Sequence, residues 1–222
     1  MRIALLVEGI GEFKALPRLI PSLEHRSGQT LLQPVQLNVH PLAPPNVIAS
    51  SLAKKMQILE QRRADQAVLL LDREDAEECP GTRAEQVATA IAKHPKITLP
   101  VQVVLKDRTL ENWLIADLTA LRTQPGRFKV TEALTKRVEP DKADRLAAID
   151  LLQSASIGRT YHKVDDAVEI CARLDPARAA RHSRSFRHLL HVLGDSTFDA
   201  GCRRPPDGLP VAQAHAVRGP FQ

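Results

Sequence analysis

Short apolar runs rich in β-branched residues alternate with longer segments of helical period in the first half of the chain. This alternation constrains the fold most strongly, because a strand, a helix and a second strand make the unit from which parallel sheets are built. We predict four strands, at residues 3–7, 35–39, 67–71 and 101–105. The first and third runs are apolar without a break, which indicates burial on both faces. The expected class is therefore α/β, with a four-stranded parallel Rossmann-like sheet and flanking helices.

The segments between the predicted strands have helical character, with one point of conflict. Asn46 is a candidate N-cap, and Thr82 with Glu85 forms a candidate capping box for a later helix. The segment after the first strand has apolar residues at helical spacing. Pro17 and Pro21 remove backbone donors there, so we expect that helix to be kinked or shortened.

The second half of the chain has a different pattern. Strands are hard to find from about residue 127 onward, whereas residues 141–152, 164–174 and 185–193 have helical period. The sequence after residue 194 is rich in proline and glycine and has no sustained apolar period. We therefore expect an α/β domain at 1–122, a C-terminal helical region at 123–194 packed on it, and a poorly ordered Pro/Gly-rich tail at 195–222.

Composition excludes several broad classes of protein. The chain has 222 residues, of which 43% are hydrophobic and 26% are charged, and these values argue against a disordered or fibrous protein. No apolar run approaches the roughly 18 to 20 residues that cross a bilayer, and Glu8 comes too early for a signal peptide. We expect a cytoplasmic protein that is not bound to a membrane. The three cysteines share no CxxC spacing, which argues against a disulfide framework or a zinc site.

Common nucleotide-binding and hydrolase motifs are absent or incomplete. Gly9 and Gly11 begin a GxGxxG pattern, but Lys14 stands where the third glycine belongs. The sequence contains neither GxxxxGK[ST] nor GxSxG. A dinucleotide cofactor and a serine-hydrolase mechanism therefore have no positive support.

Acidic residues follow the predicted strands at the edge where parallel sheets bind ligands. Glu8 follows the first strand, and Asp72, Glu74 and Asp75 follow the third. Residues i and i+2 point the same way in an extended chain, so Asp72 and Glu74 are candidates for one cation. Crowded carboxylates favour a hard ion such as Mg²⁺ or Mn²⁺, which activates water in phosphodiester chemistry. The alternative is an ordinary solvated loop at a strand end.

Two further residues are candidates for the same site. Glu111 lies in the first turn of a helix that Thr109 can cap, where it could complete or orient the site. It could equally serve only the positive end of the helix dipole. Lys163, beside Tyr161 and His162, could contact a phosphate or a leaving oxygen.

Positive charge concentrates in the second half of the chain. Lysine and arginine number 31 against 26 acids, and residues 176–191 contain no acid. Arg181, Arg184 and Arg187 are therefore candidate nucleic-acid contacts. The alternatives are a solvated helix face and a protein partner. The chain has one tryptophan, one tyrosine and five phenylalanines, so a stacking surface is scarce and we expect recognition mainly through phosphates.

Several short motifs together resemble Toprim (topoisomerase-primase) domains. They are Val7-Glu8-Gly9 before a helix, a strand ending in Asp72-x-Glu74, and the stretch from Glu111-Asn112-Trp113 to Asp117. Tyr161-His162-Lys163 and Ser183-Arg184-Ser185-Phe186 resemble later blocks of one Toprim-like bacterial family of unknown function, found near ATPase genes in mobile-element or phage-defence neighbourhoods. The resemblance covers most of residues 1–194. The same motifs resemble those of the Toprim domains in overcoming-lysogenisation-defect (OLD) nucleases.

The resemblance implies catalytic and metal-binding roles for particular residues. Glu8 matches the glutamate after the first strand, and Asp72 with Glu74 matches an Asp-x-Asp motif after the third. The sequence departs from that motif at Glu74, for which Asp75 could substitute. The resemblance implies a metal-dependent nuclease or phosphotransferase acting on DNA or RNA, with an AAA or ABC-type ATPase partner. The alternative is a non-catalytic module that binds an ATPase or nucleic acid through its basic helical half; the sequence leaves the oligomeric state open.

Overall fold

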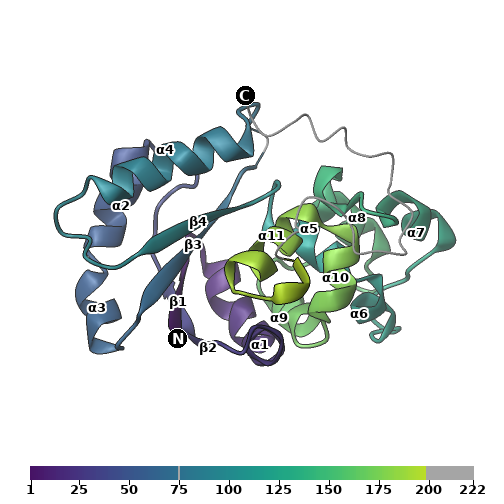
Figure 1. The fold of residues 1–222 in the computed structure, drawn as a ribbon. Coiled ribbons are helices and arrows are strands. Elements are labelled where there is room, and N and C mark those ends of the chain that lie inside the picture. The colour runs from purple at the N-terminus through teal and green to yellow at the C-terminus, as the bar shows by residue number, and fades with distance from the viewer. Residues whose placement is uncertain (75, 199–222) are drawn as a thin grey trace.

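Four parallel strands form the centre of the molecule (Figure 1). The computed structural model describes residues 1–74 and 76–198. The strands are β1 (Arg2–Val7), β2 (Thr30–Gln36), β3 (Gln66–Asp72) and β4 (Val101–Lys106), in the order β2-β1-β3-β4. The predicted α/β class and the four-stranded parallel sheet are confirmed.

The two central strands, β1 and β3, are buried on both faces. In β1, Ile3, Leu5 and Val7 belong to one apolar core, whereas Ala4 and Leu6 belong to the other. Side chains of successive strand residues point to opposite faces, so an unbroken apolar run is what a doubly covered strand requires. The carboxyl ends of β1 and β3 therefore meet beneath helices rather than in open solvent.

Helices cover both faces of the sheet (Figure 1). On one face lie α2 (Pro45–Ala53), α3 (Met56–Gln61) and α4 (Pro80–Ala92). On the other face lie α1 (Ile10–Ser27) and the helices of the second half. The latter are α5 (Leu110–Ile115), α6 (Leu118–Arg122), α7 (Glu132–Val138), α8 (Ala148–Ala155), α9 (Asp165–Cys171), α10 (Pro176–His182) and α11 (Arg184–Val192), with 3-10 turns η1 (Ala143–Arg145) and η2 (Ser196–Phe198).

Some predicted boundaries are wrong for local reasons. Strand β2 begins at Thr30 rather than residue 35, and its pairing with β1 shifts register between Leu32 and Val35, around Pro34. Proline is tolerated there because β2 is an edge strand. Helices α2 and α4 begin at prolines, Pro45 and Pro80, ahead of the predicted caps. The helix predicted at 141–152 is divided into η1 and α8.

The first helix is continuous despite its two prolines. It runs for 18 residues, from Ile10 to Ser27, with Pro17 and Pro21 inside it. Pro21 is exposed and Pro17 is partly exposed, so water can donate to the carbonyl groups that lose their helical donors. The predicted shortening is therefore wrong.

One apolar core joins α1, one face of the sheet and the helices of the second half. Trp113 of α5 is 1% exposed, and its indole Nε1 donates to Ser185 Oγ on α11 at 2.8 Å. The predicted tail starts near η2, and residues 199–222 lie outside the described residues. In the described part of the chain, no helix is long and apolar enough to span a membrane.

Candidate metal centre

Glu8 reaches from the end of β1 toward the end of β3. Its side chain is 7% exposed, and Oε1 accepts a hydrogen bond from the Asp72 backbone amide at 2.9 Å. Its other oxygen, Oε2, is buried and has no hydrogen-bond partner among the described residues. A buried carboxylate oxygen without a donor is costly, so Oε2 is an available ligand atom.

Asp72 and Lys106 are the last residues of β3 and β4 and are paired in register. Both continue the side of the sheet that faces α1, because Leu70 and Val104 two residues earlier belong to that core. Lys106 Nζ lies 2.8 Å from Asp72 Oδ1 and 3.6 Å from Glu8 Oε1. The lysine side chain is fully buried, so its charge is compensated by carboxylates rather than by bulk water.

Glu12 is the third acid of the cluster, and no sequence motif had indicated it. It lies in the first turn of α1, is 5% exposed, and forms an ion pair with Lys106 Nζ. The available signal was an acid on the otherwise apolar face of α1, at helical spacing from Ala15, Leu16 and Leu19. We name Glu8, Glu12, Asp72 and Lys106 the acidic cluster.

Burial and mutual contact shift the pKa values within the acidic cluster. Burial raises the pKa of Glu8 to about 8, despite the attraction of Lys106, and burial also raises the pKa of Asp72. Burial opposes ionisation of Glu12 as well, but contact with Lys106 outweighs it and lowers that pKa. Burial alone would lower the pKa of Lys106, yet the three carboxylates raise it above its usual value. Lys106 therefore stays charged.

The acidic cluster brings together three carboxylates that could hold a metal ion. One carboxylate oxygen from each of Glu8, Glu12 and Asp72 lies within 4.8 Å of the other two. The raised pKa of Glu8 means that a proton occupies this carboxyl group near neutral pH. A divalent cation would bind by displacing that proton and balancing the net charge of −2 (three negative charges and one positive) that the three ionised acids and Lys106 then carry. Oxygen ligands suit Mg²⁺ or Mn²⁺, and the unpartnered Oε2 of Glu8 supports the fit.

Glu74 does not join the three carboxylates that the described residues bring together. Strand β3 ends at Asp72, and Glu74 has a left-handed backbone with φ 52°. The rule that residues i and i+2 point the same way holds only in an extended chain, so it does not apply here. The Glu74 amide donates to the Arg108 carbonyl at 2.8 Å, and Asp75 lies outside the described residues.

Glu111, like Glu12, is a buried acid near Cys171. It is 5% exposed in the first turn of α5, whose predicted cap Thr109 is confirmed as part of a capping box with Asn112. Burial raises the pKa of the Cys171 thiol to about 12, and the negative charges of Glu111 and Glu12 contribute smaller increases. Burial and Glu111 likewise raise the pKa of Tyr161. Glu111 therefore acts electrostatically on Tyr161 and Cys171 and is not one of the three acids of the cluster.

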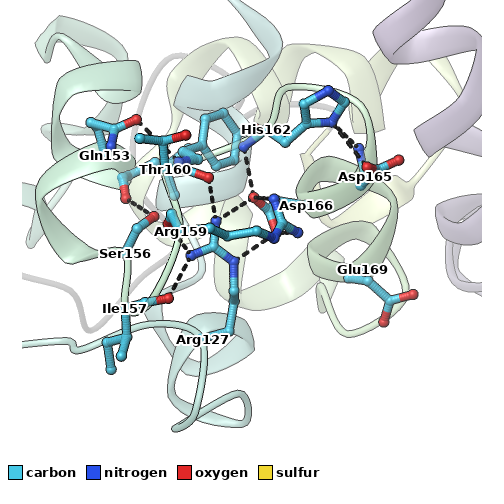
Figure 2. A network of polar contacts seen from close by, with 12 residues as sticks. Arg127, Gln153, Ser156, Ile157, Arg159, Thr160, His162, Asp165, Asp166 and Glu169 are labelled. Atoms are coloured by element: carbon cyan, nitrogen blue, oxygen red, sulfur yellow. Dashed lines mark hydrogen bonds and ion pairs between the residues drawn. The ribbon is translucent and has the colours of Figure 1, made fainter.

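A separate set of ion pairs holds the segment that contains Lys163 (Figure 2). Asp166 of α9 accepts hydrogen bonds from Arg127 Nε at 2.9 Å and from Arg159 Nη2 at 2.8 Å. The same carboxylate accepts from the His162 backbone amide at 2.7 Å. Lys163 is exposed, and a side-chain carbon at Gly11 would lie 3.9 Å from its carbonyl oxygen. The segment therefore lies beside the first turn of α1.

The predicted arginine contacts divide into exposed and buried residues. Arg181 and Arg184 are exposed, whereas Arg187 is fully buried and pairs with Asp141, Nη1 to Oδ1, at 2.8 Å. Its guanidinium cannot reach a phosphate in this fold, so that part of the prediction is wrong. The local absence of acids in sequence is misleading, because Asp141 comes from a distant loop.

These features define an α/β protein with a buried cluster of three carboxylates and a lysine at the carboxyl edge of a parallel sheet. Residues 7–194 match the family model described as Domain of unknown function (DUF4276), and the chain belongs to that family. No curated protein and no solved structure matches the chain. The resemblance to Toprim domains stays a prediction.

Proposed function

We propose that the chain is a metal-dependent, Toprim-like nuclease or phosphotransferase that acts on nucleic acid. The observation that carries the proposal is the acidic cluster, in which three carboxylate oxygens converge and Glu8 Oε2 has no partner among the described residues. Glu8, Glu12 and Asp72 would hold Mg²⁺ or Mn²⁺. When bound, such an ion polarises a phosphoryl oxygen and favours ionisation of a water molecule.

The residues of the cluster have separate roles in this proposal. Asp72 is fixed by the end of β3 and by Lys106, so its carboxylate is preorganised for a ligand. Lys106 holds the three acids together and reduces their mutual repulsion. Glu8, whose pKa burial raises to about 8, would release its proton on binding the ion, because a metal ligand must be ionised. Lys163 could neutralise a phosphate at the rim.

The broader setting rests on the resemblance of the sequence motifs. It favours a role in a bacterial defence or mobile-element system, with an AAA or ABC-type ATPase as partner. The alternative proposal is a module that binds nucleic acid or such an ATPase without catalysis. In that case the acidic cluster would serve only as a buried ion-pair cluster.

The test is hydrolysis of labelled single-stranded and duplex DNA and RNA with Mg²⁺ or Mn²⁺. The variant is Asp72→Asn, and the control is Asp150→Asn, which changes an exposed acid on α8. We expect metal-dependent cleavage by the wild type, a loss of at least about a hundredfold in Asp72→Asn, and no change in the control. Equal cleavage by Asp72→Asn would contradict the assignment, and absence of cleavage by the wild type would favour the binding module.

A further inference from the structure

The outer face of α1 carries exposed basic and apolar residues and no exposed acid. The exposed residues of this helix are Ile10, Phe13, Lys14, Arg18, Pro21 and His25. Their spacing of three, four, seven and eight residues places them along one side, opposite the buried Leu16 and Leu19. We name these six residues the α1 stripe.

The cations of the α1 stripe are free of acidic partners among the described residues. Neither Lys14 nor Arg18 forms an ion pair with any residue in 1–74 or 76–198. The two acids of α1, Glu12 and Glu24, contact residues outside the stripe. Glu12 pairs with Lys106, and the Glu24 carboxylate accepts a hydrogen bond from the Leu31 amide at 2.8 Å. The stripe therefore presents uncompensated positive charge, which suits a polyanion.

The stripe begins at the end of α1 that carries Glu12 of the acidic cluster, on the solvent side of the helix. Ile10 and Phe13 are 48% and 36% exposed, and Glu12 of the same turn belongs to the cluster. Lys14 is the next residue after Phe13, and Arg18 lies about 8 Å further along the helix axis than Phe13. The segment fixed by Asp166 brings the backbone of Lys163 to the same end of α1, beside Gly11. An aromatic ring next to unpaired cations is the combination that binds single-stranded nucleic acid.

We propose that the α1 stripe binds single-stranded nucleic acid and leads it to the acidic cluster. A base stacks on the exposed face of Phe13, and Lys14 and Arg18 contact backbone phosphates. A stacking contact of this kind needs an unpaired base, which is why a single strand is the occupant rather than a duplex. The inference rests on the proposed function and specifies its substrate class.

The test is equilibrium binding of a fluorescent 20-nucleotide oligo-dT, and of a duplex of equal length, measured in EDTA. For the double variant Lys14→Gln/Arg18→Gln, we expect the slope of log affinity against log salt for the single strand to fall by about 1.4 units. For Phe13→Leu, we expect roughly tenfold weaker binding of the single strand and unchanged duplex binding. The matched control is Lys93→Gln/Lys96→Gln, two exposed lysines after α4 on the other side of the sheet, which should bind as the wild type does.

The outcomes separate this inference from the proposed function. Wild-type affinity and salt slope in Lys14→Gln/Arg18→Gln would overturn the stripe, even if metal-dependent cleavage occurs. An equal loss in the Lys93/Lys96 control would also overturn it, because the effect would then reflect net charge alone. Stripe-dependent binding by a wild type that never cleaves would support the stripe and overturn the nuclease proposal. Thermal melting checks that the variants fold.

Discussion

Lys106 has the environment least expected of a lysine, since it is fully buried and surrounded by three carboxylates. The sequence placed it at a strand end, where lysine is usually solvated. Its position opposite Asp72 in the β3–β4 register and below Glu12 of α1 explains the difference. One cation thus compensates acids from three separate elements, and its removal leaves them buried without a counter-charge.

Substitution Lys106→Met should destabilise the fold strongly in metal-free buffer. Removing one partner of a buried ion pair costs about 3–5 kcal/mol, because the remaining charge is left uncompensated. Urea unfolding in EDTA measures the loss. A divalent cation should restore part of the stability, and by more than it stabilises the wild type. Unfolding of the variant at the wild-type urea concentration would contradict the role assigned to Lys106.

Asp144 should make the free energy of unfolding fall as the pH rises, which is opposite to the effect of an aspartate whose pKa is lowered by folding. Burial, with repulsion from Asp107, raises its pKa from 3.8 to about 6, although Ser183 and Ser185 donate hydrogen bonds to it. The folded state therefore binds this proton more tightly than the unfolded state does. The resulting stabilisation is full below about pH 4 and is lost as the pH rises through 6, by up to about 3 kcal/mol.

The measurement is the unfolding free energy of the wild type and Asp144→Asn between pH 4 and 7. The variant lacks the titrating group, so the difference between the two proteins should change across this range. A constant difference would show that Asp144 has an ordinary pKa.

At the scale of elements, the strand ends were the most predictable part of the site and the turns the least. The apolar runs placed Glu8 and Asp72 correctly at one edge, because parallel topology alone brings their strands together. The contact of Glu12 could not be placed from its own sequence, since its partner Lys106 is 94 residues away. Glu74 was misplaced because a single left-handed residue ends the extended geometry. Arg187 was misplaced because its partner is 46 residues away.

The segment between α8 and α9 is held by the hydrogen bonds of Arg127, and this role can be tested. Arg127 donates to Asp166 and to the carbonyl groups of Ile157, Arg159 and Thr160 (Figure 2). Arg127→Met should therefore free this segment while leaving the sheet folded. We expect faster amide hydrogen exchange in residues 157–163, with a loss of about 1–2 kcal/mol in global stability. Unchanged exchange there would contradict the role assigned to Arg127, since Arg159 and the His162 amide would then suffice to hold the segment.

At the scale of the whole molecule, the helical second half is continuous with the sheet. The same apolar core contains Ile3 of β1, Leu16 of α1, Trp113 of α5 and Phe186 of α11. The sequence indicated a boundary near residue 122 from the loss of strand patterns, but a change of secondary structure does not require a separate core. An isolated 1–122 fragment would expose the face of the sheet that this core covers.

We therefore expect the chain to unfold in one cooperative transition. Trp113 is the only tryptophan, and it packs edge-on against Phe186 with ring centroids 5.2 Å apart. Its fluorescence reports on the contact between α5 and α11, whereas far-ultraviolet circular dichroism reports on all helices and strands. The two unfolding curves in urea should coincide. A fluorescence transition at clearly lower urea would show that the helical half unfolds independently.

We propose that the acidic cluster of this DUF4276 protein binds a divalent cation, and calorimetric titration with Mn²⁺ measures that binding. The wild type should bind one ion, Glu8→Gln should bind at least about tenfold more weakly, and Glu74→Gln, the matched control outside the cluster, should bind as the wild type does. Equal affinity of Glu8→Gln and the wild type, or a loss confined to Glu74→Gln, would contradict the claim.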